Sequence, residues 1–366
     1  MTLSRIDRFH PAGIIELYNR LGSATAVIEH RNNITDAIPD ASRYLVDGLH
    51  NIDSQQQRAE AELDYDIRHD ITPIVMSDVR YPQRMKQCSD APLVLYFMGN
   101  ADLNARHAIN IVGTRRCTNY GRDIIRDFVK DLRELCPDVL IFSGLAYGVD
   151  ICAHRAALEN GFETVGVLAH GLDTIYPRPH RDTAVAMLSQ GGLLTEYMTH
   201  TEPFAKNFVQ RNRIVAGCSD ATILIESAAK GGGLITCSIA RSYDRDVYAF
   251  PGPVGAKYSE GCNNLIRDNG AALITSAADF VKAMRWDDDE RLRKAQQQGI
   301  QRELFPEMTE EAKTIVHALA DTNDQQLNAL TAATGIAINR LSALLFELEL
   351  KGVIKPLAGG TYHLIK

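Results

Sequence analysis

The middle of this 366-residue chain alternates short apolar runs with amphipathic stretches, and this alternation restricts the fold more than any other feature. The apolar runs are INIVG, VLIFSG, ETVGVLA, ATILIES, DVYAFPG and ALITS. Each of the first five is followed by a helical pattern. Apolar runs joined by helices are typical of parallel strands that are buried on both faces. We therefore predict a fold of the α/β class with a Rossmann-like, doubly wound parallel sheet.

Different patterns flank this sheet and divide the chain into four parts. Residues 1–65 contain short helical pieces and predict a small N-terminal helical module of the SAM or helix-hairpin-helix type, and residues 66–285 hold the extended Rossmann-like domain. Residues 286–308 are charged, rich in glutamine and poor in apolar side chains, which predicts a linker. Residues 309–366 give three helical patterns followed by two short strands around a Gly-Gly turn. This order predicts a winged-helix domain.

The N-terminal module has two helical stretches separated by Gly22 and Ser23. A helix, a tight turn and a second helix can contact a DNA backbone. The same pattern serves plain packing or protein docking more often, so its role stays open.

Composition excludes several classes of protein. The seven cysteines are well separated and form no CxxC motif or Cys/His cluster, so we expect neither disulfides nor a metal site. No apolar run approaches the roughly 18 residues that span a bilayer, and charged residues interrupt the first eleven positions. We therefore expect a cytoplasmic protein that does not contact membranes. The net charge of -7 does not exclude nucleic acid, because the excess acid lies outside residues 107–285.

Glycines and basic residues follow the predicted strands at the points where those strands end. The carboxyl ends of parallel strands share one edge of the sheet, which is where such folds bind ligands. The turns Gly113-Thr114 and Gly231-Gly232-Gly233 would let phosphates approach backbone amides. The basic candidates are Arg115 in the first of these turns, Arg178 in the turn YPRPHR, and Lys206, Arg211 and Arg213 in the segment KNFVQRNR.

Phe208 lies between Lys206 and Arg211 in this segment. Single-stranded nucleic acid needs cations for its phosphates and an aromatic face on which a base can stack. Phe208 could equally be a core residue of a helix, and both interpretations stay open.

Two other classes of function are possible for the same residues. The chain has no GxGxxG turn, Walker lysine, nucleophile elbow or HExxH motif, so we expect no catalytic residue and no cofactor. A nucleoside-monophosphate hydrolase of the lysine-decarboxylase-like group would need a glutamate after its Gly-rich turn, but here Leu234-Ile235-Thr236 follow Gly233. A structural adaptor without nucleic acid would leave the basic residues as solvated helix ends.

Seven motifs in a fixed order carry a more specific signal: GTRRCTNYG, SGLAYGVD, GLDTIYPRPH, GGLLTEY, RNRIVAG, GGGLIT and FPGPVGAKYSEGCNNLI. Together they resemble the DNA-processing protein A (DprA/Smf) family over roughly residues 71–285. The resemblance implies a dimeric protein that binds single-stranded DNA without catalysis and loads the RecA recombinase during natural transformation. It implies DNA contacts at Arg115, Ser143, Gly144, Lys206, Phe208, Arg211 and Arg213, and more weakly at Arg178.

The chain departs from the family pattern at two places. Val209 follows Phe208 where relatives often have proline, and Gly231-Gly232-Gly233 replaces a turn that often carries serine.

The winged-helix segment has few of the cations that a DNA-reading helix uses. Its third helical pattern offers Arg340 but also Glu347 and Glu349, and from residue 310 onward 5 basic residues face 6 acidic ones. We therefore expect this domain to serve partner or self contacts and to add little DNA affinity.

Overall fold

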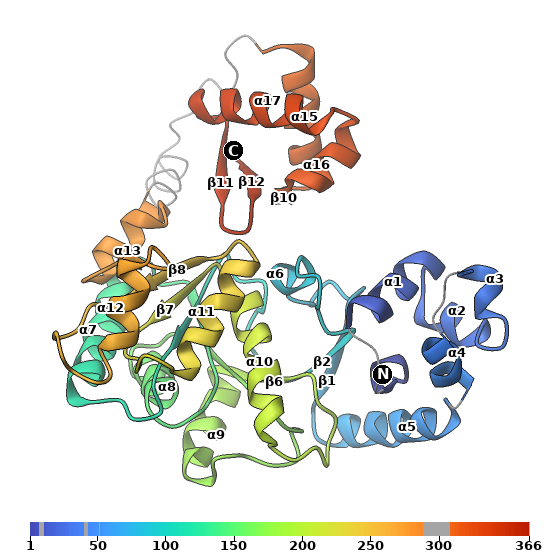
Figure 1. Ribbon diagram of the computed structural model, residues 1–366, viewed down its shortest axis with the longest axis horizontal. Helices are drawn as coiled ribbons and strands as arrows, with labels where there is room; N and C mark the ends of the chain where they lie inside the picture. Colours follow the sequence, from blue (N-terminus) through green and yellow to red (C-terminus); the bar gives the residue numbers. More distant parts are fainter. Residues whose placement is uncertain (7–10, 40–42, 51, 288–307, 366) are drawn as a thin grey trace.

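A nine-stranded sheet forms the centre of the computed structural model, which describes residues 1–6, 11–39, 43–50, 52–287 and 308–365 (Figure 1). The strands are β1 (Thr72–Val75), β2 (Val94–Gly99), β3 (His107–Val112), β4 (Val139–Ser143), β5 (Thr164–Val167), β6 (Gly191–Thr195), β7 (Ala221–Leu224), β8 (Asp246–Ala249) and β9 (Ala272–Leu273). Their order is β1-β2-β6-β5-β4-β3-β7-β8-β9. The strands from β6 to β9 in this order run parallel, which confirms the predicted doubly wound sheet.

The edge of the sheet differs from the prediction. β1 and β2 pair antiparallel with each other, and β2 pairs antiparallel with β6. β6 is also a strand that the sequence pattern does not predict. Its segment begins with Gly191-Gly192, and glycine is depleted in strands. Here the glycines are needed, because a Cβ on Gly191 would lie 2.0 Å from the Thr164 carbonyl oxygen on β5.

Helices cover both faces of the sheet. One face carries α7 (Asn119–Leu135), α8 (Val149–Glu159) and α13 (Ala277–Ala283), and the other carries α6 (Gln83–Lys86), α10 (Ala205–Gly217), α11 (Gly232–Ser242) and α12 (Glu260–Arg267). α7 shows why these segments are helical: Ile125, Phe128, Val129 and Leu132 occupy positions i, i+3, i+4 and i+7 and are all buried. The side chain of Thr118 caps its first turn.

The strand order reverses between β3 and β7, and Glu226 connects the two strands there. Its backbone oxygen accepts a hydrogen bond from the Thr114 amide at 2.7 Å. Its carboxylate, only 2% exposed, accepts from the Thr118 amide at 2.8 Å and the Thr118 hydroxyl at 2.6 Å. Glu226, which follows β7, therefore fixes both the turn after β3 and the start of α7.

The N-terminal part is helical and has its own small core. It contains η1 (Leu3–Arg5), α1 (Pro11–Leu21), α2 (Ala24–Glu29), α3 (Ile34–Ala37), α4 (Arg43–His50) and α5 (Asp53–Arg68). Leu17, Val27, Ile34 and Leu49 pack together. The predicted boundary at residue 65 falls inside α5. This helix is tied to the sheet domain because Glu62 accepts hydrogen bonds from the amide and hydroxyl of Thr199 at 2.7 and 2.5 Å.

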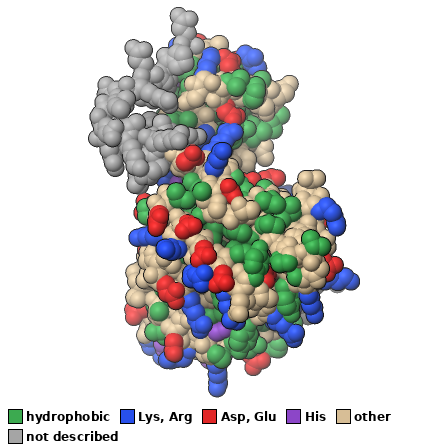
Figure 2. Space-filling model, turned by 90° about the vertical axis from the view of Figure 1, so that its left-hand side faces the viewer, with side chains coloured by type: hydrophobic (Ala, Val, Ile, Leu, Met, Phe, Trp, Pro, Cys, Tyr) green, Lys and Arg blue, Asp and Glu red, His purple; other side chains and the backbone are tan. Residues whose placement is uncertain are grey.

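The C-terminal part has the winged-helix layout that the sequence predicted. It contains α15 (Glu310–Asp321), β10 (Gln325–Gln326), α16 (Leu327–Thr334), α17 (Ile338–Leu350), β11 (Ile354–Leu357) and β12 (Thr361–Leu364). Figure 2 shows it as a separate lobe above the larger domain. No single helix among the described residues is long and apolar enough to cross a membrane, and α16 and α17 meet that test only as a pair bent by 107°.

The predicted linker is corrected at its start, and most of it, residues 288–307, lies outside the described residues. Trp286 was assigned to the linker but is only 3% exposed. Its ring stacks on His107 at 4.2 Å between centroids and meets Phe280 edge-on at 5.2 Å. The sheet domain therefore extends through Trp286.

Replacing Glu226 with glutamine should destabilise the sheet domain. The amide nitrogen of glutamine would face the donors of Thr118, so one buried hydrogen bond is lost and the negative charge leaves the start of α7. We expect a loss of about 1 to 3 kcal/mol in the free energy of unfolding, measured by urea denaturation. Glu159→Gln, an exposed change at the end of α8, serves as the control. Equal midpoints for the two variants would contradict this role of Glu226.

Candidate nucleic-acid interface

Arg115 and two aromatic rings meet beyond the carboxyl ends of the central strands. Arg115 is exposed in the turn after β3, and its guanidinium carbon lies 5.3 Å from the centre of the Phe208 ring. The Tyr176 ring lies 5.9 Å from the same ring, tilted by 59°. Phe208 is half-buried rather than enclosed in the core. A cation and two ring faces are thus presented together to solvent.

Further exposed aromatic side chains surround this group. Tyr176, Tyr147 and Phe204 are 46%, 48% and 56% exposed. Tyr147 meets the His180 ring edge-on at 4.8 Å, and His180 is fixed by the Leu145 carbonyl oxygen at 2.8 Å. Large exposed rings are unfavourable in water, so several of them beside cations indicate a surface that is covered by a ligand.

These three aromatic residues are not among the contacts predicted from the sequence. Tyr147 and Tyr176 lie inside two of the seven motifs, each in a segment that follows a predicted strand, so their position was an available signal. Phe204 precedes α10, which had not been assigned as an element of the alternation.

Three predicted basic residues lie on the surface. Arg115 and Lys206 are exposed, Lys206 in the first turn of α10. Arg178 is exposed in the short helix η2 (Arg178–His180), which follows the loop that carries Tyr176. These side chains are free to meet phosphates.

Arg211 is placed differently, inside the protein. It is 4% exposed, and its guanidinium group donates to the backbone oxygens of Gly144, at 2.6 Å, and of Val167. A Cβ on Gly144 would lie 2.5 Å from both the Arg211 guanidinium and the Asp150 carboxylate, so only glycine fits there. Burial raises the pKa of Asp150, and the nearby Arg211 opposes that shift. Arg211 therefore holds the loop after β4 against the last residue of β5.

Arg213 and Ser143 are also buried. Arg213 is 6% exposed, forms an ion pair with Glu196 at 2.5 Å and donates to the Asp90 backbone oxygen at 2.7 Å. The Ser143 hydroxyl donates to the Ile111 backbone oxygen at 2.6 Å, which connects β4 to β3. Neither side chain reaches the surface.

The glycines of the predicted phosphate-binding turns are mostly required by packing. A Cβ on Gly113 would lie 2.6 Å from Val149, and one on Gly233 would lie 3.1 Å from the Gly113 Cα. A Cβ on Gly231 would lie 2.1 Å from the Ser227 hydroxyl, whereas Gly232 faces open space. The start of α7, where a dinucleotide phosphate would bind in a Rossmann domain, is already occupied by the Glu226 carboxylate.

A cavity of about 510 Å³ opens beside the exposed aromatic rings. We call it the arginine pocket, because its lining includes Arg115, Arg116, Arg122 and Arg155 from the turn after β3, α7 and α8. Arg122 donates to Asn119 at 3.4 Å and Arg155 to Thr183 at 3.3 Å, which are neutral partners. No carboxylate among the described residues pairs with these four groups, so the pocket attracts anions.

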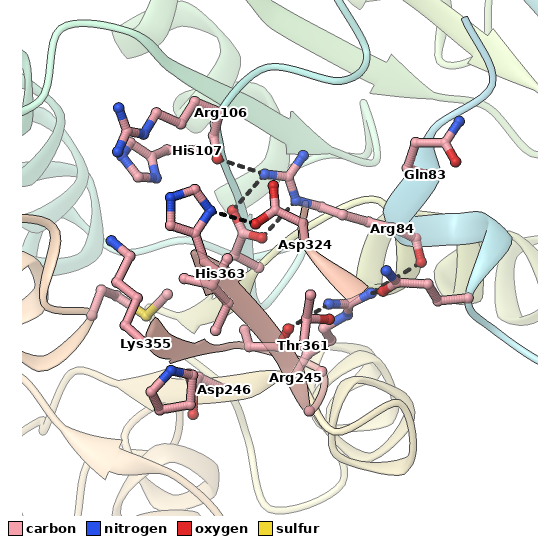
Figure 3. Close-up of a pocket in the computed structure, with 18 of the residues that line it drawn as sticks. Gln83, Arg84, Arg106, His107, Arg245, Asp246, Asp324, Lys355, Thr361 and His363 are labelled. Atoms are coloured by element: carbon pink, nitrogen blue, oxygen red, sulfur yellow. Dashed lines mark hydrogen bonds and ion pairs between the residues drawn. The ribbon is translucent and has the colours of Figure 1, made fainter. Parts of the chain in front are cut away.

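A larger cavity, of about 790 Å³, lies between the sheet domain and the winged-helix domain. Figure 3 shows Arg84, His363 and Asp324 in its lining. Arg84 forms an ion pair with Asp220 at 2.6 Å, and His363 forms a hydrogen bond with Asp324 at 2.6 Å. Asp220 and Asp246 lie at the amino ends of β7 and β8. This cavity is therefore on the opposite edge from the ligand-binding edge of the sheet and belongs to the contact between domains.

Known proteins share both domains. The family model for DNA recombination-mediator protein A matches residues 72–285, and the DprA winged helix domain matches residues 305–360. Protein Smf of Escherichia coli is 33% identical over 293 residues, which cover 78% of this chain and 75% of that protein.

Two solved structures are also similar. DNA processing protein A from Streptococcus pneumoniae has a TM-score of 0.65 at 30% identity, covering 77% of this chain and 95% of that chain. DNA processing protein A from Helicobacter pylori, described in terms of its single-stranded DNA binding mode, has a TM-score of 0.54 at 27% identity, covering 59% and 96%. The match over most of the sheet domain and the matching winged helix leave one assignment: the chain belongs to the DprA/Smf family.

Proposed function

We propose that this protein binds single-stranded DNA on the surface formed by Arg115, Tyr147, Tyr176, Lys206 and Phe208, and passes the strand to the RecA recombinase. The observation that carries the proposal is the contact of Arg115 with Phe208, 5.3 Å from its ring, beside the exposed Tyr176. A guanidinium can bind a phosphate while the neighbouring rings stack bases, and a duplex offers no free base faces. We further propose that the protein acts in the cytoplasm as a homodimer.

The proposal separates two roles that the sequence could not distinguish. Arg115, Lys206 and Arg178 are exposed and would contact DNA, with Arg178 at the margin. Arg211 and Arg213 are buried and would act through the loops that they hold. Family members are described as DNA-processing proteins, and this chain is proposed to process DNA by binding, without catalysis. Glu226, the carboxylate at the strand reversal, caps α7 and is not free for hydrolysis.

Single-stranded DNA should bind more tightly than duplex, with strong dependence on salt. The three exposed cations and one or two arginines of the pocket would neutralise four or five phosphates, which gives a log-log salt slope of about -3 to -3.5. Fluorescence anisotropy of a labelled oligonucleotide and of its duplex, each titrated at several salt concentrations, measures both quantities. Equal affinity for both forms, or no binding at low salt, would overturn the proposed function.

Substitutions on the proposed surface should separate phosphate contact from stacking. Arg115→Ala should weaken binding about tenfold and reduce the salt slope by about 0.7, because one phosphate contact is lost. Phe208→Ala should cost about 1 to 3 kcal/mol of binding while leaving the salt slope unchanged, because stacking releases no counterions.

Arg267→Ala is the matched control for Arg115→Ala. Arg267 is an exposed arginine at the end of α12, where it pairs with Asp268. Its loss should change neither affinity nor salt slope. Unchanged affinity in a folded Phe208→Ala variant, with folding checked by circular dichroism, would exclude stacking on this ring.

Removing the winged-helix domain should leave most DNA affinity intact. Lys313, Arg340 and Lys351 each pair with a glutamate of the same domain, at 2.6 to 2.7 Å, so their charges are compensated. The domain contacts the opposite edge of the sheet, where Arg245 donates to the Ala358 backbone oxygen at 3.0 Å. Deleting residues 309–366 should reduce affinity in the same anisotropy titration by less than tenfold, and a larger loss would contradict this prediction.

A further inference from the structure

Two cysteines line the arginine pocket and the proposed function makes no use of them. Cys117 follows Arg115 and Arg116 in the turn after β3, and Cys152 lies in the first turn of α8. Both residues line the same cavity, and Cys152 packs against the apolar cluster that contains Cys117. Cys152 is half-buried with access to the cavity, whereas Cys117 is 8% exposed. The pair thus consists of one thiol open to small reagents and one behind it.

The surroundings of Cys152 favour its thiolate. Hydrogen bonding from Cys117 and the charges of Arg122 and Arg155 lower the pKa of Cys152 to about 7, against the opposing effect of burial. The same partnership raises the pKa of Cys117, which stays a thiol. A half-buried thiolate that opens to a cavity, with a second thiol lining the same cavity, is the arrangement typical of redox-reactive cysteines.

The other five cysteines have the opposite environment. Cys88, Cys136, Cys218, Cys237 and Cys262 are buried, at most 7% exposed. Burial raises the pKa of Cys88 to about 11 and that of Cys262 to about 12. These five thiols should react slowly, so their rate of oxidation serves as an internal reference for that of Cys117 and Cys152.

We propose that Cys117 and Cys152 form a redox-reactive thiol pair in the arginine pocket, which hydrogen peroxide oxidises to a disulfide and which a phosphate-bearing ligand in the pocket protects. The Cys152 sulfur attacks one peroxide oxygen, the O–O bond breaks, and the departing hydroxide takes a proton to become water. The Cys117 sulfur then attacks the resulting sulfenic acid, and its proton leaves with the hydroxyl as a second water. Two thiols lose two electrons, and one peroxide becomes two waters.

Protection follows from the same geometry. An anion held by Arg122 and Arg155 would fill the cavity in front of Cys152 and withdraw the positive charge that favours its thiolate. Both effects slow the reaction. That this anion is a DNA phosphate rests on the proposed function, whereas the reactivity of the free pair does not.

The test uses the full chain, treated with limiting hydrogen peroxide and blocked with iodoacetamide before peptide mass spectrometry. We expect a linked Cys117–Cys152 peptide before any of the other five thiols is lost. Cys152→Ser should abolish the link and leave Cys117 reduced, whereas Cys117→Ser should leave a sulfenic acid on Cys152 that dimedone traps. A linked peptide that is absent, or that forms no faster than the five buried thiols react, would overturn the proposal.

Two further arms separate the causes. Arg122→Gln with Arg155→Gln should slow linkage about fivefold, because less thiolate is present at neutral pH, whereas Arg267→Ala should not. Inorganic pyrophosphate and a single-stranded oligonucleotide should each slow linkage of the wild type about tenfold. If pyrophosphate has no effect, protection by a bound anion is wrong.

The oligonucleotide arm distinguishes this inference from the proposed function. An oligonucleotide that binds in the anisotropy assay but gives no protection would show that DNA does not enter the arginine pocket. If the reduced protein does not bind the oligonucleotide at all, the proposed function fails, while the linked peptide and the pyrophosphate arm still decide the thiol pair.

Discussion

The hydrogen bonds made by Glu226 are the interaction on which the geometry of this surface depends. The strand order reverses between β3 and β7, and the crevice at such a reversal needs something to hold its two sides. Glu226 binds Thr114 through its backbone and Thr118 through its carboxylate. The turn that carries Arg115 is therefore fixed at both ends. A Rossmann domain usually leaves this helix start free for a phosphate, and here an internal carboxylate takes that place.

Burial divides the arginines of this edge into two groups. Arg211 and Arg213 are buried. Arg211 donates hydrogen bonds to backbone oxygens, and Arg213 forms an ion pair with Glu196. Enclosed arginines of this kind are costly to leave unpaired, so their partners are part of the fold. Arg115 and the other arginines of the pocket have no acidic partner among the described residues and stay available. Lys206 lies in the same segment as Arg211 and Arg213 but is exposed, so this one segment contributes both to the fold and to the surface.

The sequence predicted most of the fold because its strands are buried on both faces. Runs such as VLIFSG and ATILIES carry that signal by themselves. It could not predict β6, where two glycines are required by the neighbouring backbone of β5, nor the antiparallel edge, which depends on pairing between distant segments. The position of Trp286 was misjudged because charged residues follow it directly, while its ring packs against His107 and Phe280.

The candidate site was only partly predictable, because burial of a charged side chain leaves no mark in the sequence. The RNR motif consists of three polar residues, and its sequence does not show which of them are buried. In α10, Arg211 and Arg213 are buried, whereas Lys206, near the start of the same helix, is exposed. Arg122 and Arg155 lie on different helices and meet Cys152 only in the folded chain. The order of synthesis has a consequence here: Thr118 and Glu226 are 108 residues apart, so the turn carrying Arg115 lacks its anchor while the ribosome is still making α8, α9 (Arg181–Ser189) and α10. A nascent chain therefore completes this surface only when β7 has emerged from the ribosome and paired. The protein can bind its ligand only late in its synthesis.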